Sequence, residues 1–587
     1  MPEGELRALA ITRLDADLQA RWPNTLRLDN FALARRFPHR TGLVASWRIA
    51  DALPGPGGSV LVSVDSNFPW SLPRIALPEA PNGLSYPHIE VDGQICIAPA
   101  SAVYELPVGI RHVESLVDDA ARLLEQGRTR ANDADFFSEA HSYWGLVESV
   151  AGSFLALNKV PMKHAVWASA SCGANVLIAD SEHAITTWAK TAAQKIGALE
   201  PALILALDEP LHPRNYPLTP RDLIELCERI GASGELKATV ARWRYRAPLR
   251  AVLAFPHAER QVLLGAEMPL PSTVKFPGSR RFGIHGFRPQ PKGTTARLAA
   301  LAHIPGRFQH WKAISIQRDF LHKRTAGDGA AMLATCHVMI VGCGALGGQL
   351  ATQLSQAGVG SLTLLDKDVL DWRNVGRHVL DGTSVGMNKA VALRDSILRR
   401  FPDAIVEAHA RTWEEQFALT PEVFDQVDLI ISATAEPASN LRLDRLSETD
   451  EVAPVVFGWM EPFAACSHAV FRHPSGAGLA ELADTCGLLY DPVIDRETAP
   501  SLPQEPACGA MFQPYSSLNA LSCVSLVGEL SVDALLGRAS SSTIRTWIGA
   551  SSAFQDNGLS ITPVWHTRVN RDGFCRRYDR PIVLGAR

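Results

Sequence analysis

The stretch from 337 to 366 constrains the fold more than any other part of the chain. It begins with HVMIVGCG, a near-continuous apolar run that meets glycines, as in a buried parallel strand. ALGGQLATQLSQAGVG follows with helical spacing and a glycine stop, and SLTLLD is a second buried strand. Gly342, Gly344 and Gly347 fit a Gly-x-Gly-x-x-Gly loop, and Asp366 ends the second strand. This βαβ pattern predicts a nucleotide site, with phosphate at the helix N-terminus and the acid on a ribose hydroxyl.

Length and composition limit the remaining possibilities. A chain of 587 residues is too long for one core, which predicts three or four domains. Its formal net charge of -4 argues against a generally basic nucleic-acid binder. No uninterrupted apolar run reaches about 18 residues, and the N-terminus lacks the apolar region of a signal peptide. We therefore expect a soluble cytoplasmic protein, with no membrane and no direct nucleic-acid partner.

The pattern along the chain divides it into three parts. Residues 1–155 contain short β-rich runs followed by helical spacing over 109–127, which predicts a small α+β domain. Residues 156–322 predict a middle linker domain in which we find no catalytic constellation. Residues 323–587 hold the βαβ unit and predict a Rossmann-like α/β domain.

Two cations near the glycine loop distinguish between classes of nucleotide enzyme. Asn374, Arg377 and Lys389 follow shortly after the ribose acid Asp366. A hydride-transfer enzyme has no need of two cations close to the phosphates. An enzyme that breaks the α–β bond of ATP does, because negative charge builds on the leaving pyrophosphate. The alternative is that Arg377 and Lys389 are ordinary surface charges.

These residues together resemble the adenylating domain of the ubiquitin-activating, ThiF-like superfamily. That family has a glycine loop, an Asp-x-Asp, an Asn-x-x-Arg and a lysine after a glycine turn. This chain has GCGALG, Asp366-Lys-Asp368, Asn374-Val-Gly-Arg377 and Gly386-Met-Asn-Lys389. The resemblance covers roughly 318 to 535 and implies ATP and Mg²⁺ as cofactors.

Two further features of the family map less directly onto this sequence. Family members use an arginine upstream of the glycine loop, contributed across a dimer. Arg318 in QRDFLHKR is at the corresponding distance, with Arg324 as the second choice, so the resemblance implies a homodimer. Sulfur-carrier members place a magnesium-binding Asp in a context like DCTDN. Here the strand ends as DLIISATAEP, that position is Ala435, and the adjacent Glu436 is the candidate metal ligand.

The stretch SYPHIEVDGQICIAP contains Cys96 between two isoleucines, which is also how a core cysteine looks. Its context resembles ubiquitin-conjugating domains, which carry a Phe-Pro-x-x-x-Pro segment, a His-Pro-Asn turn and then Gly-x-Ile-Cys-Leu. This chain has FPWSLP, then Tyr-Pro-His88, then Gly-Gln-Ile-Cys96-Ile. The resemblance implies that Cys96 is the conjugating nucleophile. His88 takes the place of the asparagine, where it can donate a hydrogen bond to an oxyanion or, if close, raise the thiolate fraction of Cys96. The alternative is a partly buried structural histidine.

Activating enzymes of the conjugating kind pass the acyl group to a cysteine of their own. Cys508 is our candidate, because EPACGAMFQPYSSLNAL places it in a Pro- and Gly-rich segment directly before a helix. The arrangement resembles the autophagy-type activating enzymes. Cys523 lies on an apolar helical face, which predicts a core residue. Cys466 and Cys486 remain open as substitutes for Cys508.

Taken together, the chain resembles the bacterial fusions of a conjugating and an activating domain that occur in anti-phage CBASS operons. That resemblance implies adenylation of a protein's C-terminal carboxylate, a thioester on Cys508, transfer to Cys96 and ligation to a target amine. It also implies that the substrate is a cGAS-like nucleotidyltransferase. Conjugation of a bacterial ubiquitin-like protein remains open. So does a sulfur-carrier adenylyltransferase with a non-catalytic first domain, and so does a non-catalytic scaffold.

Overall fold

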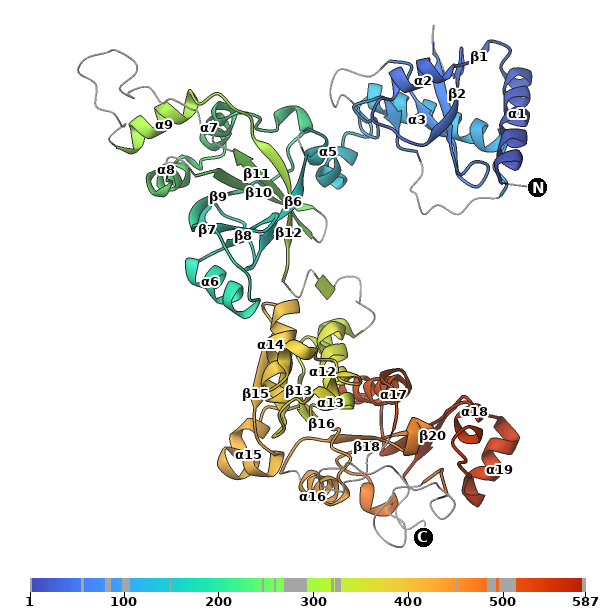
Figure 1. Ribbon diagram of the computed structural model, residues 1–587. Coiled ribbons are helices and arrows are strands. Elements are labelled where there is room, and N and C mark those ends of the chain that lie inside the picture. The colour runs from blue at the N-terminus through green and yellow to red at the C-terminus, as the bar shows by residue number, and fades with distance from the viewer. Residues whose placement is uncertain are drawn as a thin grey trace. The chain divides into compact units, whose positions relative to one another are not determined.

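The computed structural model divides the chain into two compact units, and each is described by itself (Figure 1). One unit holds residues 1–185 and 196–314, and the other holds 186–195 and 315–587. The predicted division of the first unit into two domains, at 155 and 156, therefore stays a prediction. The residues that the structure describes are 3–53, 58–79, 86–97, 106–147, 149–244, 247–257, 260–268, 293–317, 321–322, 329–449, 451–482, 492–495 and 514–582.

The N-terminal domain is a five-stranded antiparallel sheet with helices on both faces. Its strands, in spatial order, are β1 (Thr25–Arg27), β2 (Leu43–Ile49), β3 (Val60–Asp65), β4 (Arg74–Ala76) and β5 (Gln94–Ile95). Alternate residues of β3 face opposite layers, since Val62 packs with α1 (Glu3–Arg21) and α3 (Ile110–Arg128), while Leu61 packs with α2 (Asn30–Arg36). The helix predicted over 109–127 is α3.

The middle domain is a closed barrel in the strand order β10-β11-β12-β6-β8-β7-β9 (Figure 1). Its strands are β6 (Ser149–Ala156), β7 (Ala165–Cys172), β8 (Asn175–Ala179), β9 (Glu200–Ala206), β10 (Leu249–His257), β11 (Arg260–Met268) and β12 (Gln309–Ser315). Its helices are α6 (Glu182–Thr191), α7 (Pro220–Arg229), α8 (Ser233–Arg242) and α9 (Thr294–Ala302). One buried cluster comes from the strands and fills the barrel, and a second lies between the strands and the helices.

Two short helices join the N-terminal sheet to the barrel. They are α4 (Asp135–Ser138) and α5 (Ala140–Val147). Phe136, Ala140, Tyr143 and Trp144 belong to the buried cluster that includes α7, α8 and the barrel strands, not to the clusters around the N-terminal sheet. The apolar faces of α4 and α5 are therefore part of the core of the middle domain.

The second unit contains an eight-stranded mixed sheet in the order β15-β14-β13-β16-β17-β18-β19-β20. Its first five strands are parallel and its last three are antiparallel. They are β13 (His337–Val341), β14 (Ser361–Leu365), β15 (Ile405–His409), β16 (Leu429–Ser432), β17 (Val455–Met460), β18 (Cys466–Arg472), β19 (Thr543–Ile548) and β20 (Arg576–Pro581). The Rossmann-like class predicted for this part of the chain is confirmed, as is the mixed α/β and α+β class of the whole.

Helices cover both faces of this sheet. One face packs against α12 (Ala345–Ala357), α14 (Lys389–Arg400) and α17 (Ser517–Leu535). The other packs against α15 (Trp413–Leu419) and α16 (Pro437–Glu448). Four further helices are α11 (Ala330–Leu333), α13 (Trp372–Val375), α18 (Ser551–Gln555) and α19 (Pro563–Asp572).

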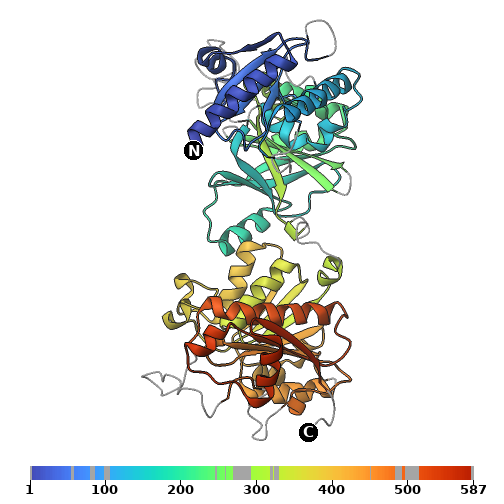
Figure 2. The same ribbon diagram turned by 90° about the vertical axis from the view of Figure 1, so that its right-hand side faces the viewer.

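By length and composition, α17 is the one helix among the described residues apolar enough to cross a membrane. Cys523, Val527 and Leu530 of α17 are buried in the core beside the sheet, and Figure 2 shows the helix lying across the strands. Its apolar character is thus used for packing within the unit.

Candidate thiol and nucleotide sites

The Cys96 thiol is exposed at the end of β5, directly after a tight turn. Gly93 has a φ of +84°, which a side chain would strain, and its carbonyl accepts a hydrogen bond from the Leu77 N–H at 2.8 Å. The backbone N–H of Cys96 donates to the His88 carbonyl at 2.7 Å. The interpretation of Cys96 as a core cysteine therefore does not fit the structure, because Cys96 is exposed while its neighbour Ile95 is buried.

Two arginines of the segment around α2 hold this turn. The guanidinium of Arg36 donates to the carbonyls of Leu77, Pro78 and Asp92 at 2.6–2.8 Å. Arg40 donates to the Asp92 carboxylate at 2.5 Å and to that of Glu90 at 2.6 Å. The loop before the thiol is therefore anchored to the sheet edge by charge-assisted bonds.

His88 lies against Cys96 in a left-handed backbone conformation, with φ of 61°. Its backbone N–H donates to the Tyr143 hydroxyl at 2.7 Å. Its ring contacts two carboxylates, Nε2 with Asp135 Oδ2 at 3.0 Å and Nδ1 with Glu139 Oε1 at 3.7 Å. The hydrogen bond with Cys96, and then the two carboxylates, outweigh burial and raise the pKa of His88 to about 9. The imidazole is therefore cationic at neutral pH and can stabilise negative charge at the thiol.

Cys96 and His88 are predicted from the sequence, whereas Asp135, Glu139 and Tyr143 are not. These three residues lie more than forty positions from His88 in the chain. Their only signal is the spacing of four residues between them in DADFFSEAHSY, which places polar groups on one helical side.

The predicted glycine loop forms the floor of a cavity in the second unit. Gly342 follows β13 with φ of +86°, and Gly344 caps the N-terminus of α12. A Cβ on Gly347 would lie 1.8 Å from the Gly342 carbonyl oxygen, so only glycine fits there. The cavity is lined by Val341, Gly342, Gly344, Leu365, Asp366, Lys367, Asp368, Lys389, Arg411, Thr412, Trp413, Glu414, Ala433, Thr434, Glu436 and Ser439.

Asp366 ties the glycine loop to the end of β14. Its carboxylate accepts from the N–H groups of Cys343 and Asp368, both at 2.7 Å, and burial raises its pKa. The Lys389 ammonium lies 3.0 Å from Asp368 Oδ2 and is largely buried. An acid and a cation thus face the same cavity from the two ends of the connection between β14 and α14, at the carboxyl ends of the parallel strands, where nucleotides bind in such sheets.

Not all predicted residues meet at this cavity. Gly342, Gly344, Asp366, Lys389 and Glu436 line it, and Gly347 packs directly beneath it. The side chain of Asn374 accepts from the N–H of Asp371 at 3.1 Å and so caps α13. The Arg377 guanidinium lies 5.6 Å from the ring of Tyr515, and neither Asn374 nor Arg377 is among the lining residues. Arg318, Arg324, Cys486 and Cys508 lie outside the described residues.

The loop between β15 and α15 contributes lining residues that sequence analysis missed. Arg411 brings a third cation to the cavity beside Lys389 and Lys367. Glu414 accepts a 2.7 Å hydrogen bond from the Ser439 hydroxyl, which in turn accepts one from the Trp413 indole at 2.8 Å. The available signal was position, because this loop follows a strand that pairs in parallel with β14.

The described cysteines of the second unit differ sharply in exposure. Cys466 and Cys523 are fully buried, and burial raises the pKa of both thiols, that of Cys523 to about 12. His468, next to Cys466, is itself buried and bonded to Glu461 at 2.6 Å, so it does not open the site to solvent. Cys466 is therefore a poor substitute for Cys508, whereas Cys575 is exposed.

Two known protein families match separate parts of the chain. Residues 40–152 match the prokaryotic E2 family B, and residues 316–526 match the ThiF family. The chain joins an E2-like domain to a ThiF (E1-like) domain. Cys96 and His88 lie inside the first match, and the glycine loop with its cavity lies inside the second.

Several curated relatives carry the name ATP-dependent ubiquitin transferase-like protein Cap2. The one from Enterobacter hormaechei is 31% identical over 205 residues, covering 33% of this chain and 32% of that protein. The one from Pseudomonas aeruginosa is 23% identical over 522 residues, covering 80% of this chain and 84% of that protein. The chain thus spans about a third of the length of the first relative. Among solved structures, Escherichia coli MccB with ATP matches at 15% identity and a TM-score of 0.31, covering 44% of this chain and 66% of that chain.

Proposed function

We propose that the protein activates the C-terminal carboxylate of a protein with ATP and joins it to a target amine through two successive thioesters. The observation that carries this is the exposed Cys96 thiol beside a cationic His88, in one chain with a ThiF-type nucleotide cavity. A thiol built for acyl transfer and a site built for carboxyl activation are the two halves of one conjugation reaction.

The first step is adenylation in the ThiF domain. A carboxylate oxygen of the substrate attacks the α-phosphorus of ATP, the bond to the bridging oxygen breaks, and pyrophosphate leaves. Gly342 and Gly344 let backbone approach the phosphates, and Asp366 accepts from a ribose hydroxyl. Lys389 and Arg411 face the cavity and offset the charge that develops on pyrophosphate.

The donor set of the cavity suits Mg²⁺. Asp368 and Glu436 line the same cavity, although among the described residues no group of three or more His, Cys, Asp or Glu side chains is placed to hold a metal ion. Magnesium is commonly held by one or two carboxylates together with substrate phosphates and water. Glu436, at the N-cap of α16, is the ligand we assign in place of the missing Asp at Ala435. Bound there, the ion would neutralise phosphate charge.

Two thiols then carry the acyl group. The Cys508 thiolate attacks the acyl carbon of the adenylate, and AMP leaves. The Cys96 thiolate attacks the new thioester, and Cys508 leaves as thiolate. The nitrogen of the target amine attacks the Cys96 thioester, Cys96 leaves as thiolate, and the amine loses a proton to solvent. His88 donates toward the oxyanion formed on the acyl carbon at Cys96.

The substrate we propose is a cGAS-like nucleotidyltransferase of an antiviral CBASS system, because the chain resembles the conjugating–activating fusions of such systems and several of its relatives are named Cap2. A bacterial ubiquitin-like protein is the second candidate, since the E2-like domain serves either. Relatives named adenylyltransferase/sulfurtransferase, such as MoeZ of Mycobacterium tuberculosis, match only 18% of the chain, at 36% identity. A function of that kind would leave the E2-like domain without a role, which disfavours sulfur-carrier chemistry.

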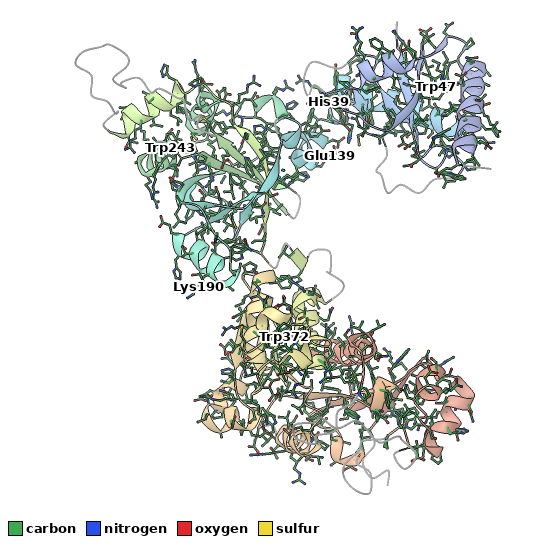
Figure 3. The ribbon with its side chains drawn as sticks, viewed as in Figure 1. His39, Trp47, Glu139, Lys190, Trp243 and Trp372 are labelled. Carbon is green, nitrogen blue, oxygen red and sulfur yellow. The ribbon has the colours of Figure 1, made fainter. Side chains whose placement is uncertain are left out.

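We also propose a homodimer in which Arg318 reaches the partner's nucleotide. Three apolar side chains are exposed on the segment between Asp368 and Lys389, namely Val369, Trp372 and Met387 (Figure 3 labels Trp372). An apolar surface beside a charged cavity is typical of an interface. A two-fold contact there would place both nucleotide sites near the dimer axis.

Cysteine variants can test the order in which the two thiols receive the acyl group. Cys508→Ala should keep ATP–pyrophosphate exchange, because adenylation needs no thiol, and should carry no thioester. Cys96→Ala should still load Cys508, giving an adduct cleaved by reducing agent, and should form no amide product. Cys575→Ala, which removes a different exposed thiol, is the matched control and should behave as wild type. Amide product from Cys96→Ala would overturn the conjugating role of Cys96.

A further inference from the structure

The site around Cys96 includes three residues from helices that pack in the core of another domain. Asp135, Glu139 and Tyr143 contact His88, yet they come from α4, α5 and the junction between them. The apolar residues of these helices pack with the barrel, not with the sheet that carries Cys96. Glu139, labelled in Figure 3, directly precedes α5.

The anchoring of α5 in the barrel is tight. The Trp144 indole donates to the Gly265 carbonyl on β11 at 2.8 Å. Its ring stacks on that of His310 on β12, with centroids 3.8 Å apart and planes 6° apart. His310 in turn bonds to the Trp144 carbonyl at 3.1 Å, and both residues are buried.

Helix α4 is held by the same domain. The Phe136 ring lies 4.6 Å from that of His212, in the middle domain, and 4.8 Å from that of Tyr143. The middle domain therefore holds Tyr143 in two ways, through the adjacent Trp144, which is bonded to the barrel strands, and through the Phe136 ring, and the Tyr143 hydroxyl accepts from the His88 backbone.

We propose that the middle domain is a positioning module for the E2-like thiol, which presents Asp135, Glu139 and Tyr143 to His88 and so sets how readily Cys96 reacts. Tyr143 fixes the strained His88 backbone, whose carbonyl receives the Cys96 N–H. Asp135 and Glu139 fix the ring and keep it protonated. This inference rests on the proposed function only in treating Cys96 as the thiol that carries the acyl group, because the position of the three residues beside His88 is a property of the fold.

The groups that act on the His88 ring come from two elements. Cys96 acts from the N-terminal sheet, and Asp135 and Glu139 act from the helices, with the Tyr143 hydroxyl bonded to the His88 backbone and to Glu139. Loss of the two carboxylates removes part of what favours imidazolium, while the hydrogen bond with Cys96, the largest cause, remains. The pKa of His88 is then lower than in the wild type, and the thiol has a cationic neighbour over a narrower pH range.

The test is the rate at which iodoacetamide alkylates Cys96 in the full chain, followed on the Cys96 peptide by mass spectrometry from pH 5 to 10. The double variant Asp135→Asn/Glu139→Gln should react roughly threefold to tenfold more slowly at pH 7–8, because the thiolate is the reacting form. The rates should approach each other near pH 10, where most of the imidazolium is lost in both proteins. A variant that had only lost structure would not converge in this way.

Trp144→Phe tests the barrel's part in the effect. It removes the indole donor to Gly265 and should shift the alkylation profile in the same direction, while ATP–pyrophosphate exchange by the ThiF domain stays at the wild-type rate. Asp118→Asn, an exposed carboxylate on α3, is the control and should change nothing. Profiles of the double variant and Trp144→Phe that both match wild type would overturn the proposal. Failure of the relay itself would instead show as amide product from Cys96→Ala.

Discussion

The nucleotide site and the thiol site of this protein are built in opposite ways. The nucleotide cavity is formed by consecutive loops of one sheet, with Gly342, Asp366 and Lys389 each placed by the strand or helix beside it. The thiol site gathers Cys96 and His88 from one domain and Asp135 from helices packed in another. A site built from local backbone depends on a few irreplaceable residues, whereas a site built from distant elements depends on how those elements pack.

The largest expected effect is at the nucleotide cavity. Lys389→Ala should lower ATP–pyrophosphate exchange by about 100-fold or more, because it removes a charge that acts on the transition state. Arg400→Ala, an exposed cation on the same helix, is the control and should leave exchange unchanged. Normal exchange by a folded Lys389→Ala protein would remove Lys389 from the adenylation step.

A second experiment tests whether the nucleotide site is completed by a residue from another copy of the chain. Arg318→Ala and Asp366→Ala should each be inactive in exchange. Mixing them should restore activity through heterodimers that hold one intact site. If subunit exchange is demonstrated and no activity returns, the site is not shared across the two-fold axis.

Alanine substitutions at two glycines of the loop should impair the protein for different reasons. Gly347→Ala should lower the free energy of unfolding by about 1–3 kcal/mol or more, because its Cβ would overlap the Gly342 carbonyl. A Cβ on Gly344 meets open space, so Gly344→Ala should unfold at nearly the wild-type temperature and still exchange pyrophosphate poorly. Equal stability of the two variants by thermal unfolding would contradict the close approach of Gly347 to the Gly342 carbonyl.

The smallest effect concerns pH and the thiol site. The pKa of His88 in the fold is about 9, above the ordinary value of about 6.5. Its ion pair therefore contributes stability that is fully present below pH 6.5 and is lost as pH rises through 9. Asp135→Asn should lower the unfolding temperature of the protein at pH 6 and have less effect at pH 10, with a cost below about 1 kcal/mol because the pair is partly exposed. A loss of stability independent of pH would show that Asp135 acts through packing alone.

The difference between the two sites explains which of their residues could be predicted from the sequence. The βαβ unit was readable because strand, glycine loop and Asp366 follow one another, and their periodicity is local. Cys96 and His88 were found through a short motif. Asp135, Glu139 and Tyr143 were not, because the contact depends on α5 packing against β11 and β12, far along the chain. The motif spacing predicts Arg377 near the phosphates; the structure places its guanidinium 5.6 Å from the ring of Tyr515, and the phosphate role stays a prediction.

The packing of α5 in the barrel also limits which segments of such a protein recombination can exchange without loss of the fold. Recombination preserves a fold when the exchanged segment carries its own core, and Phe136, Ala140 and Trp144 have theirs in the barrel. A conjugating domain exchanged with everything up to residue 155 would strip the barrel of part of its interior. One exchanged up to the end of α3 would keep both cores but meet foreign carboxylates at its thiol. The two domains are therefore expected to descend together, and Asp135 and Glu139 to change in step with His88.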